Sequence, residues 1–301
     1  MKYYLLEQDY NPGSSSETES WDLPRTENIK SLIFDITAQQ SSGTAATRSN
    51  TAAQLDQIRI GAAESNRVSE IDGEDLDAFN ILNGNETNFN SSAADNARIT
   101  LGMVYALDPF CMNPETQFTQ PFGLSGNVAR KVEVAFAADG SNIDSKNLSI
   151  GIVTTPQATN GYMAFHRDSY TVANNVNNFT DVPQPGKLLG VFNYETTSAT
   201  DITADGSYRT GQTIQEQSIT ISRKDVVGHV YTTTMGAMQG GYTANLTDKG
   251  YSFWNFGITN AIGNLGIPSS GEIPQNMEVR TKGGSAADAV RVMPVTLNTN
   301  V

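Results

Sequence analysis

The run SEIDGEDLD is the densest group of side chains in the sequence that could do chemistry. It brings together Glu70, Asp72, Glu74, Asp75 and Asp77. Carboxylate oxygens are hard ligands that suit Ca²⁺, but the spacing does not fit the twelve-residue EF-hand loop. We therefore expect a solvated acidic loop or the start of a helix, and we keep Glu70, Asp72, Glu74 and Asp75 as calcium candidates. No other cofactor or metal is expected.

Residues suited to nucleophilic or acid-base catalysis are few. Cys111 is the single cysteine and lies in an apolar stretch, where a small buried residue is expected. Ser125 lies in GLSG, which is one residue short of a nucleophile elbow and precedes a strand where the elbow needs a helix. His166 and His229 would each need a partner supplied by the fold. We predict no catalytic residue and expect that the protein is not an enzyme.

Charge and composition exclude further classes. The chain has 301 residues, a formal net charge of −13 and a pI of about 4.5, so its field repels phosphate backbones, and direct binding of nucleic acid is disfavoured. Charged residues make up only 17% of the sequence, and Asn, Ser, Thr, Gln and Gly favour turns and strand edges. No apolar run is long enough for a membrane span or a signal peptide.

Short apolar runs bounded by Gly, Asn, Asp and Ser predict an all-β fold with sandwich-like spacing. The clearest strand is 128–136, where Val132, Val134 and Phe136 share one face. Residues 148–152 alternate in the same way, and we expect these two strands to be neighbours. Helical periodicity is weak. Its best candidates, 51–57 and 69–79, are short segments within a β framework, which argues against parallel βαβ units.

The first ten residues are separated from the rest by the polar stretch NPGSSSETES. We expect residues 1–20 to form an N-terminal arm. Its apolar residues Tyr3, Tyr4, Leu5 and Leu6 form an interaction segment. This segment could dock either on its own domain or on a neighbouring molecule.

The two halves of the chain share an ordered pattern. Asp22-Leu23-Pro24 precedes an apolar run, and Asp181-Val182-Pro183 precedes a similar one, displaced by about half the length of the chain. A second block, in which Ile219 matches Ile58, repeats at nearly the same displacement. Two ordered blocks indicate an internal duplication. We expect modules at 21–165 and 166–301, the second including a linker near residues 166–180.

The segments DLPRTENIKSLIFDITA and DVPQPGKLLGVFNYETT, the returns LDQIRI and QSITI, and QPFGLSGNVARKVEVAFAADG carry a resemblance of layout. The chain resembles the double jelly-roll major capsid proteins of tailless icosahedral, membrane-containing bacteriophages. The resemblance implies two tandem eight-stranded jelly rolls and homotrimers that form pseudo-hexagonal capsomers of a virion. The implied partners are other copies of the chain, other capsid proteins such as a vertex protein, and the internal viral membrane through the arm. Assembly would occur in the host cytoplasm.

Two other functions remain open from the residues alone. A β-sandwich adhesin, spike or carbohydrate-binding module could use Trp21, Trp254 and the aromatic run YSFWNF to stack on sugars. A glycosidase could draw a pair of acids from the 32 carboxylates. For YSFWNF we favour strand positions in a core or an interface, because its aromatic residues alternate with small polar ones.

Overall fold

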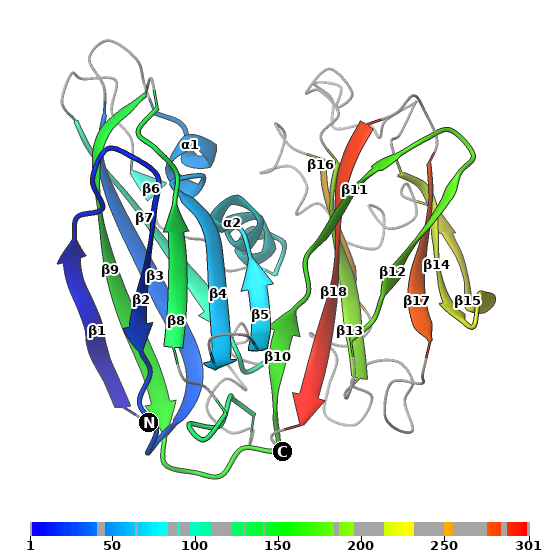
Figure 1. The fold of residues 1–301 in the computed structure, drawn as a ribbon, viewed down its shortest axis with the longest axis horizontal. Coiled ribbons are helices and arrows are strands. Elements are labelled where there is room, and N and C mark those ends of the chain that lie inside the picture. The colour runs from blue at the N-terminus through cyan, green and yellow to red at the C-terminus, as the bar shows by residue number, and fades with distance from the viewer. Residues whose placement is uncertain are drawn as a thin grey trace. The chain divides into compact units, whose positions relative to one another are not determined.

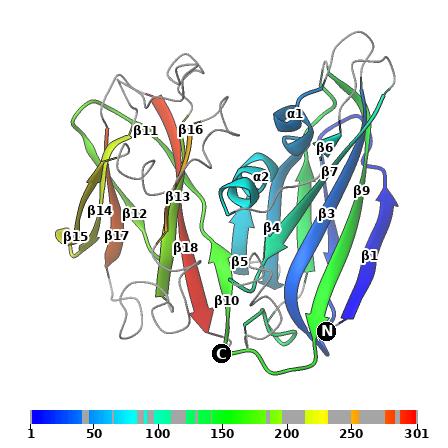
Figure 2. The ribbon, with the colours of Figure 1, turned by 180° about the vertical axis from the view of Figure 1, so that it is seen from behind.

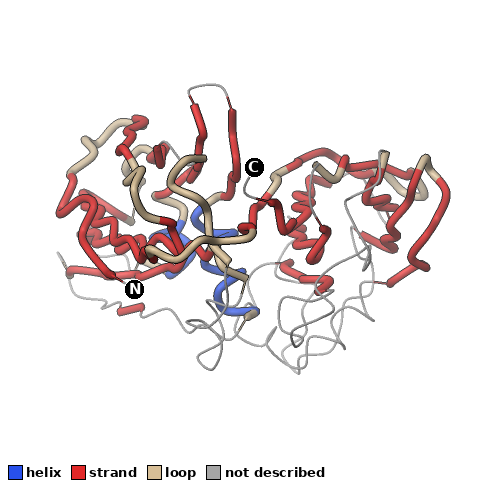
Figure 3. The backbone as a smooth tube through the Cα atoms, turned by 90° about the horizontal axis from the view of Figure 1, so that it is seen from below, coloured by secondary structure: helices blue, strands red, loops and turns tan. Residues whose placement is uncertain are grey.

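The computed structural model describes residues 2–40, 46–63, 66–83, 89–90, 97–109, 122–128, 131–140, 142–183, 187–195, 214–231, 250–255, 276–283 and 288–299. These residues form two compact units (Figure 1). The first comprises Met1–Asn80, Asn85–Ala164 and Thr299–Val301, and the second Ile81–Gly84 and Phe165–Asn298. Strands dominate the described chain, and the two helices are short (Figure 3).

The early strands are β1 (Lys2–Tyr10), β2 (Glu17–Asp22), β3 (Asn28–Gln40), β4 (Leu55–Ala63), β5 (Asn66–Ile71), β6 (Phe89–Asn90), β7 (Arg98–Ala106), β8 (Lys131–Phe136) and β9 (Ile143–Thr155). The helices are α1 (Arg48–Ala52) and α2 (Gly73–Leu82). The later strands are β10 (Gly161–Phe165), β11 (Asp168–Val172), β12 (Asn177–Asp181), β13 (Lys187–Glu195), β14 (Ile214–Ile221), β15 (Lys224–Tyr231), β16 (Gly250–Asn255), β17 (Met277–Gly283) and β18 (Asp288–Thr299).

The first unit is an antiparallel sandwich of two sheets. One sheet has the order β1-β9-β3-β7-β6 and is seen from behind in Figure 2. The other has the order β2-β8-β4-β5. When the short β6 is set aside, the eight remaining strands pair in chain order as 1-8-3-6 and 2-7-4-5. Successive strands alternate between two four-stranded sheets except for the fourth and fifth, which pair within one sheet, and this is the jelly-roll topology.

The second unit repeats this topology strand for strand. Its sheets run β11-β18-β13-β16 and β12-β17-β14-β15. Again the eight strands from β11 to β18 pair as 1-8-3-6 and 2-7-4-5. The chain is therefore a double jelly roll, as the sequence predicted.

A β-bulge repeats at the same place in both units. In the first, Ile29 is opposite Thr154 and Ser31 is opposite Val153, so that Lys30 is the extra residue. In the second, Leu188 is opposite Thr296 and Gly190 is opposite Val295, so that the extra residue lies at position 189. The displacement from Ile29 to Leu188 equals that from Asp22 to Asp181. The duplication thus extends to an irregularity of the backbone, which fixes the residue-by-residue equivalence of the two sheets.

Alternation along the strands builds the core of the first unit. Val132 and Val134 of β8 are fully buried, and Phe136 is 2% exposed, as predicted. Their partners across the ladder, Ile60 and Ile58, are also buried. The opposite face of β8 is only partly buried, so the strand has one core side and one outer side.

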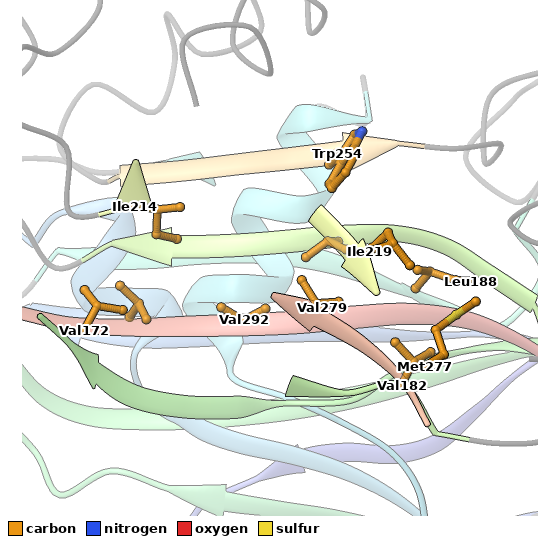
Figure 4. Packing of buried hydrophobic residues seen from close by; sticks show 11 residues of the cluster. Val172, Val182, Leu188, Ile214, Ile219, Trp254, Met277, Val279 and Val292 are labelled. Atoms are coloured by element: carbon orange, nitrogen blue, oxygen red, sulfur yellow. The ribbon is translucent and has the colours of Figure 1, made fainter. Parts of the chain in front are cut away.

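The core of the second unit mixes an apolar cluster with a buried polar network. Figure 4 shows the apolar part, in which residues such as Ile219, Val279 and Val292 pack together. Beside it, the amides of Asn193 and Gln217 exchange two hydrogen bonds of 2.9 Å across the two sheets. Gln217 also donates to Thr281 Oγ1 at 3.0 Å, and Asn193 contacts Ser252 Oγ at 3.4 Å.

Two expectations about single elements were wrong. Strands β8 and β9 are not neighbours, because β8 pairs with β2 and β4 whereas β9 pairs with β1 and β3. The seventh and eighth strands of this jelly roll lie in opposite sheets, so similar alternation in consecutive runs does not imply pairing. The helix predicted at 51–57 is the shorter α1, because residues from Leu55 onward belong to β4. The helix predicted at 69–79 begins only at Gly73, because the residues up to Ile71 belong to β5.

The structure also places residues 1–20 differently from the expected arm. They belong to the first unit, where β1 and the start of β2 are its first two strands. The expected linker at 166–180 likewise contains β11 and most of β12, the first two strands of the second jelly roll. Asp22 and Asp181 end the second strand of their units, and therefore the repeated blocks cover the third and fourth strands rather than the module starts.

Candidate functional site

Strand β1 carries the predicted interaction segment and lies at the edge of its sheet. It pairs with β9, with Tyr3 opposite Val153 and Leu5 opposite Gly151, so the segment docks on its own chain. Tyr3 and Leu5 point outward and are 62% and 44% exposed, whereas Tyr4 and Leu6 are partly buried. A Cβ added to Gly151 would lie 2.7 Å from the Tyr3 hydroxyl, which shows how closely this ring lies over the neighbouring strand.

Ionic and hydrogen-bonding contacts hold the start of β1 in place. Lys2 forms an ion pair with Glu27, and Thr154 Oγ1 donates to the second carboxylate oxygen of Glu27. These hydrogen bonds lower the pKa of Glu27. The first residues of the chain are thereby tied to both β9 and the β2–β3 connection.

The far end of β1 is closed by an aromatic group. The Tyr10 hydroxyl donates to Glu17 at 2.8 Å, and Trp21 Nε1 donates to Glu7 at 2.7 Å. The Tyr10 and Trp21 rings meet edge to face at 5.3 Å. Burial, followed by the hydrogen bond to Glu17, raises the pKa of Tyr10. Trp21 is thus engaged within the first unit and is not a free sugar-stacking platform.

The edge of β1 is irregular. Its register with β9 shifts between Leu5 and Glu7 and again between Glu7 and Tyr10, and Asp9 has a positive φ of 51°. Bulges of this kind protect an edge strand from pairing with another chain's strand. By contrast, β11, the equivalent strand of the second unit, keeps a regular register with β18.

The acidic run does not converge on a point. Arg59 lies 3.4 Å from Glu70, Ser49 donates to Glu74, and Arg48 binds Asp77 through two hydrogen bonds of 2.6 and 2.9 Å. Within the described ranges, no group of three or more acidic, histidine or cysteine side chains could hold a metal ion. Asp75 is fully buried at the start of α2. The calcium candidates therefore spread over a strand end and a helix start.

The candidate catalytic residues are also dispersed. His166 Nε2 lies 2.8 Å from Thr296 Oγ1, and burial lowers the pKa of His166 to about 4. Ser125 lies in a turn, where its carbonyl accepts from Val128, as expected. His229 lies within β15, and Cys111 lies outside the described residues.

The aromatic run of β16 divides between two faces of its sheet. Trp254 is 4% exposed and packs in the apolar core. Tyr251 and Phe253 lie on the other face, where Tyr251 stacks on Phe192 at 5.6 Å. The expectation of strand positions in a core is met by Trp254. Phe256 lies outside the described residues.

Residues that complete an outer face with Tyr3 and Leu5 were missed in the sequence. Ile33, Val104 and Val153 are partly exposed there, and Ile33 is opposite both Gly151 and Val104. The signal was present in the run Leu32-Ile33-Phe34, which is apolar on both faces of a strand, whereas a strand with one solvated face would alternate.

The double jelly roll defines a class of fold that occurs in viral capsid proteins. No protein-family model matches the sequence, and no curated protein matches it. Among solved structures, the chain is similar to the STIV MCP, with 11% identity, a TM-score of 0.63, and coverage of 99% of this chain and 96% of that one.

Two further solved structures extend the likeness. The major capsid protein P2 of bacteriophage PM2 gives 11% identity and a TM-score of 0.57, with 99% of this chain and 98% of that one covered. The PBCV-1 virus capsid gives 9% identity and a TM-score of 0.58, with 98% and 94% covered. The likeness at such low identity is one of fold, and it extends over nearly the whole of each chain. Neither of the two described helices could span a lipid bilayer.

Proposed function

We propose that this chain is a major capsid protein, the coat subunit of an icosahedral viral shell. One observation carries the proposal. The chain consists of two jelly rolls of identical topology, and this whole arrangement, not one domain of it, matches the capsid proteins of STIV and bacteriophage PM2 over 96% and 98% of their chains.

The duplicated architecture suits this role. Three copies of a chain with two equivalent units present six similar lobes, and such a ring can tile a closed surface with few kinds of contact. The proposed unit of assembly is therefore a homotrimer that forms a pseudo-hexagonal capsomer. Its partners are further copies of the chain and other capsid proteins, and its place is the virion after assembly in the host cytoplasm. Its role is structural and not catalytic.

The adhesin or carbohydrate-binding alternative is not favoured. Trp254 is core, and Trp21 is held by Glu7 and Tyr10. A stacking platform for sugars needs aromatic faces open to solvent. Among the described residues, the large apolar side chains that are exposed are Tyr3, Leu5 and Val176, which do not form a row of rings.

Self-association of the purified chain tests the proposal. Sedimentation velocity and size exclusion with light scattering should give trimers, and negative-stain images should show larger shells or sheets at high protein concentration. A chain that stays monomeric at the highest soluble concentration would overturn the assignment. Specific binding on a glycan array by such a monomer would favour the carbohydrate-binding alternative.

A further inference from the structure

The outer face of the β1-β9-β3-β7 sheet carries an apolar patch at one end. Neighbouring strands contribute Tyr3, Leu5, Val153, Ile33 and Val104, which we name the outer patch. Tyr3 and Leu5 are 62% and 44% exposed, and the other three are partly exposed. Polar residues continue the face beyond the patch, with Asp35 opposite Ser149 and Thr37 opposite Asn147.

The equivalent face of the second unit is buried and aromatic. The shared bulge makes Ile33 and Asp35 equivalent to Phe192 and Tyr194, at the displacement that relates Asp22 to Asp181. In the neighbouring strand, Val104 and Gly102 correspond to Phe253 and Tyr251, because each faces the equivalent partner. The four rings Phe192, Tyr194, Tyr251 and Phe253 are 0%, 8%, 7% and 3% exposed.

The same face of the equivalent sheet is therefore buried in the second unit and partly exposed in the first. The Tyr194 and Tyr251 rings lie 4.8 Å apart, and the Arg291 guanidinium lies 4.0 Å from the centre of the Tyr194 ring. This face of the second unit is therefore packed within a single chain. The same face of the first unit is left with its apolar end open.

We infer that a second copy of this chain covers the outer patch. The inference rests on the proposed function, because it assumes that the chain assembles with itself. In such an assembly the two equivalent units occupy similar surroundings, so a face that is covered in one unit is covered in the other. A single chain already buries the four rings on this face of its second unit, and a second copy of the chain can supply equivalent cover to the outer patch of its first.

The contact is made face to face. The two register shifts of β1 and the positive φ of Asp9 interrupt the edge, so a partner strand could not continue the ladder. The outer patch has the composition of an interface core, with exposed Tyr and Leu side chains on the edge strand, aliphatic side chains on the inner strands, and polar neighbours that include Asp35 and Ser149.

A second copy fits better than a lipid surface. Within β1, Lys2 is the only basic residue, and it forms an ion pair with Glu27. The net charge of −13 opposes approach to anionic head groups. Tyr4 and Leu6, which would have to enter a membrane together with Tyr3 and Leu5, point the other way and are partly buried in the sandwich.

A double variant, Tyr3→Lys with Leu5→Lys, tests the inference in the full chain. Both side chains point to solvent, so the variant should fold with the melting temperature of the native monomer. Self-association should weaken at least about tenfold, as expected when the most exposed large apolar side chains of an interface are replaced by charges. Thr171→Lys is the matched control, because Thr171 is exposed on the equivalent strand β11 and is not in the outer patch. It should associate like the native chain.

Sedimentation velocity separates the outcomes. If the native chain associates and the double variant associates equally well, the outer patch is not the interface and the inference is overturned while the proposed function stands. If the native chain is monomeric, both fail. A third outcome concerns lipid. If the double variant associates like the native chain but no longer binds vesicles of phosphatidylcholine, alone or mixed with phosphatidylserine, that the native chain binds, the inference is overturned and the outer patch is a lipid-binding surface.

Maleimide labelling gives a second measurement that does not depend on the stability of the lysine variant. In a Cys111→Ser background, Leu5→Cys should react at least about tenfold more slowly in the oligomer than in the dilute monomer. Thr171→Cys in the same background should react at the same rate in both. Equal labelling of position 5 in both states would overturn the inference.

Discussion

The two jelly rolls share a topology but fill four equivalent core positions with opposite chemistry. In the second unit these positions are the hydrogen-bonded Asn193, Gln217, Ser252 and Thr281. The shared register makes Phe34, Leu55, Met103 and Phe136 their counterparts in the first unit. All four counterparts are 0% to 2% exposed.

The difference teaches that the topology does not depend on one kind of core. The first unit gains from burial of apolar area at all four positions. The second unit satisfies its polar groups with one another, which contributes less net free energy but penalises any other alignment of the two sheets, since a displaced amide would be buried without a partner. We therefore expect the second unit to be the less stable and the more sensitive to single changes that leave a group unpaired.

The largest loss of stability is expected when Phe34 of the first unit is replaced by asparagine, the residue at the equivalent position of the second unit. Phe34→Asn removes a buried ring and leaves an amide among apolar side chains, so it should destabilise the first unit by at least about 4 kcal/mol. Hydrogen exchange of β3, measured by mass spectrometry, reports the loss. Phe34→Leu is the control and should cost only about 1–2 kcal/mol. A similar loss for both variants would mean that polarity at this position is unimportant.

The next largest effect is expected from low pH, which should destabilise the second unit more than the first. The equivalent threonines have different partners, Glu27 for Thr154 and His166 for Thr296. The folded pKa of His166 is about 4, below its ordinary value near 6.5. As the pH falls below 6.5, the unfolded chain binds a proton at this histidine before the folded chain does, and this favours unfolding. The free energy of unfolding should therefore fall by about 3 kcal/mol between neutral pH and pH 4. The lowered pKa of Glu27 contributes stability that is lost only when the pH falls through and below the ordinary carboxylate range.

Urea unfolding at pH 7 and pH 4 measures this difference. His166→Gln keeps a hydrogen-bonding group near Thr296 but does not titrate, so its loss of stability between the two pH values should be about 3 kcal/mol smaller. If the native chain and the variant lose the same amount, the buried histidine is not the source of acid sensitivity.

Breaking the amide pair should have a smaller effect. Asn193→Leu leaves the Gln217 amide short of its partner and should cost about 2 kcal/mol, read from hydrogen exchange of β13 and β14. The double variant Asn193→Leu with Gln217→Leu removes both amides and should recover part of that loss. Additive losses in this double-mutant cycle would show that the two amides are not coupled.

The smallest expected effect is that of calcium on the first unit, which carries the acidic run. Arg48 and Arg59 already neutralise Asp77 and Glu70, and these carboxylates point to different partners. Millimolar calcium should therefore leave the melting temperature unchanged. A rise that disappears in Asp72→Asn with Asp75→Asn would show that the run binds the ion after all.

The sequence predicted the strand-rich double module because the third and fourth strands of each unit retain matching apolar patterns. It did not predict the module starts. In β2, Glu17, Glu19 and Trp21 face the interior side and are held by Tyr10 and Glu7, so hydropathy alone makes the strand look like a polar linker. The first strands differ as well, since the bulged β1 has nine residues and β11 has five.

The outer patch was only half predictable from the sequence. Tyr3 and Leu5 were identified as interaction residues because they are apolar and lie near a chain end. Ile33, Val104 and Val153 join them only through strand order, which places β9 between β1 and β3. No local pattern encodes that crossover. Sheet order arises from long-range pairing, and a single sequence shows which strands exist more readily than which strands meet.

The shared bulge shows what this position of the fold tolerates. An extra residue lies next to the same buried threonine in both units, at Lys30 and Leu189. The first unit places a buried ion pair between Lys30 and Asp108 there, and the second places an apolar leucine. The irregularity of the backbone is therefore kept while its side chain changes from a paired charge to a hydrocarbon.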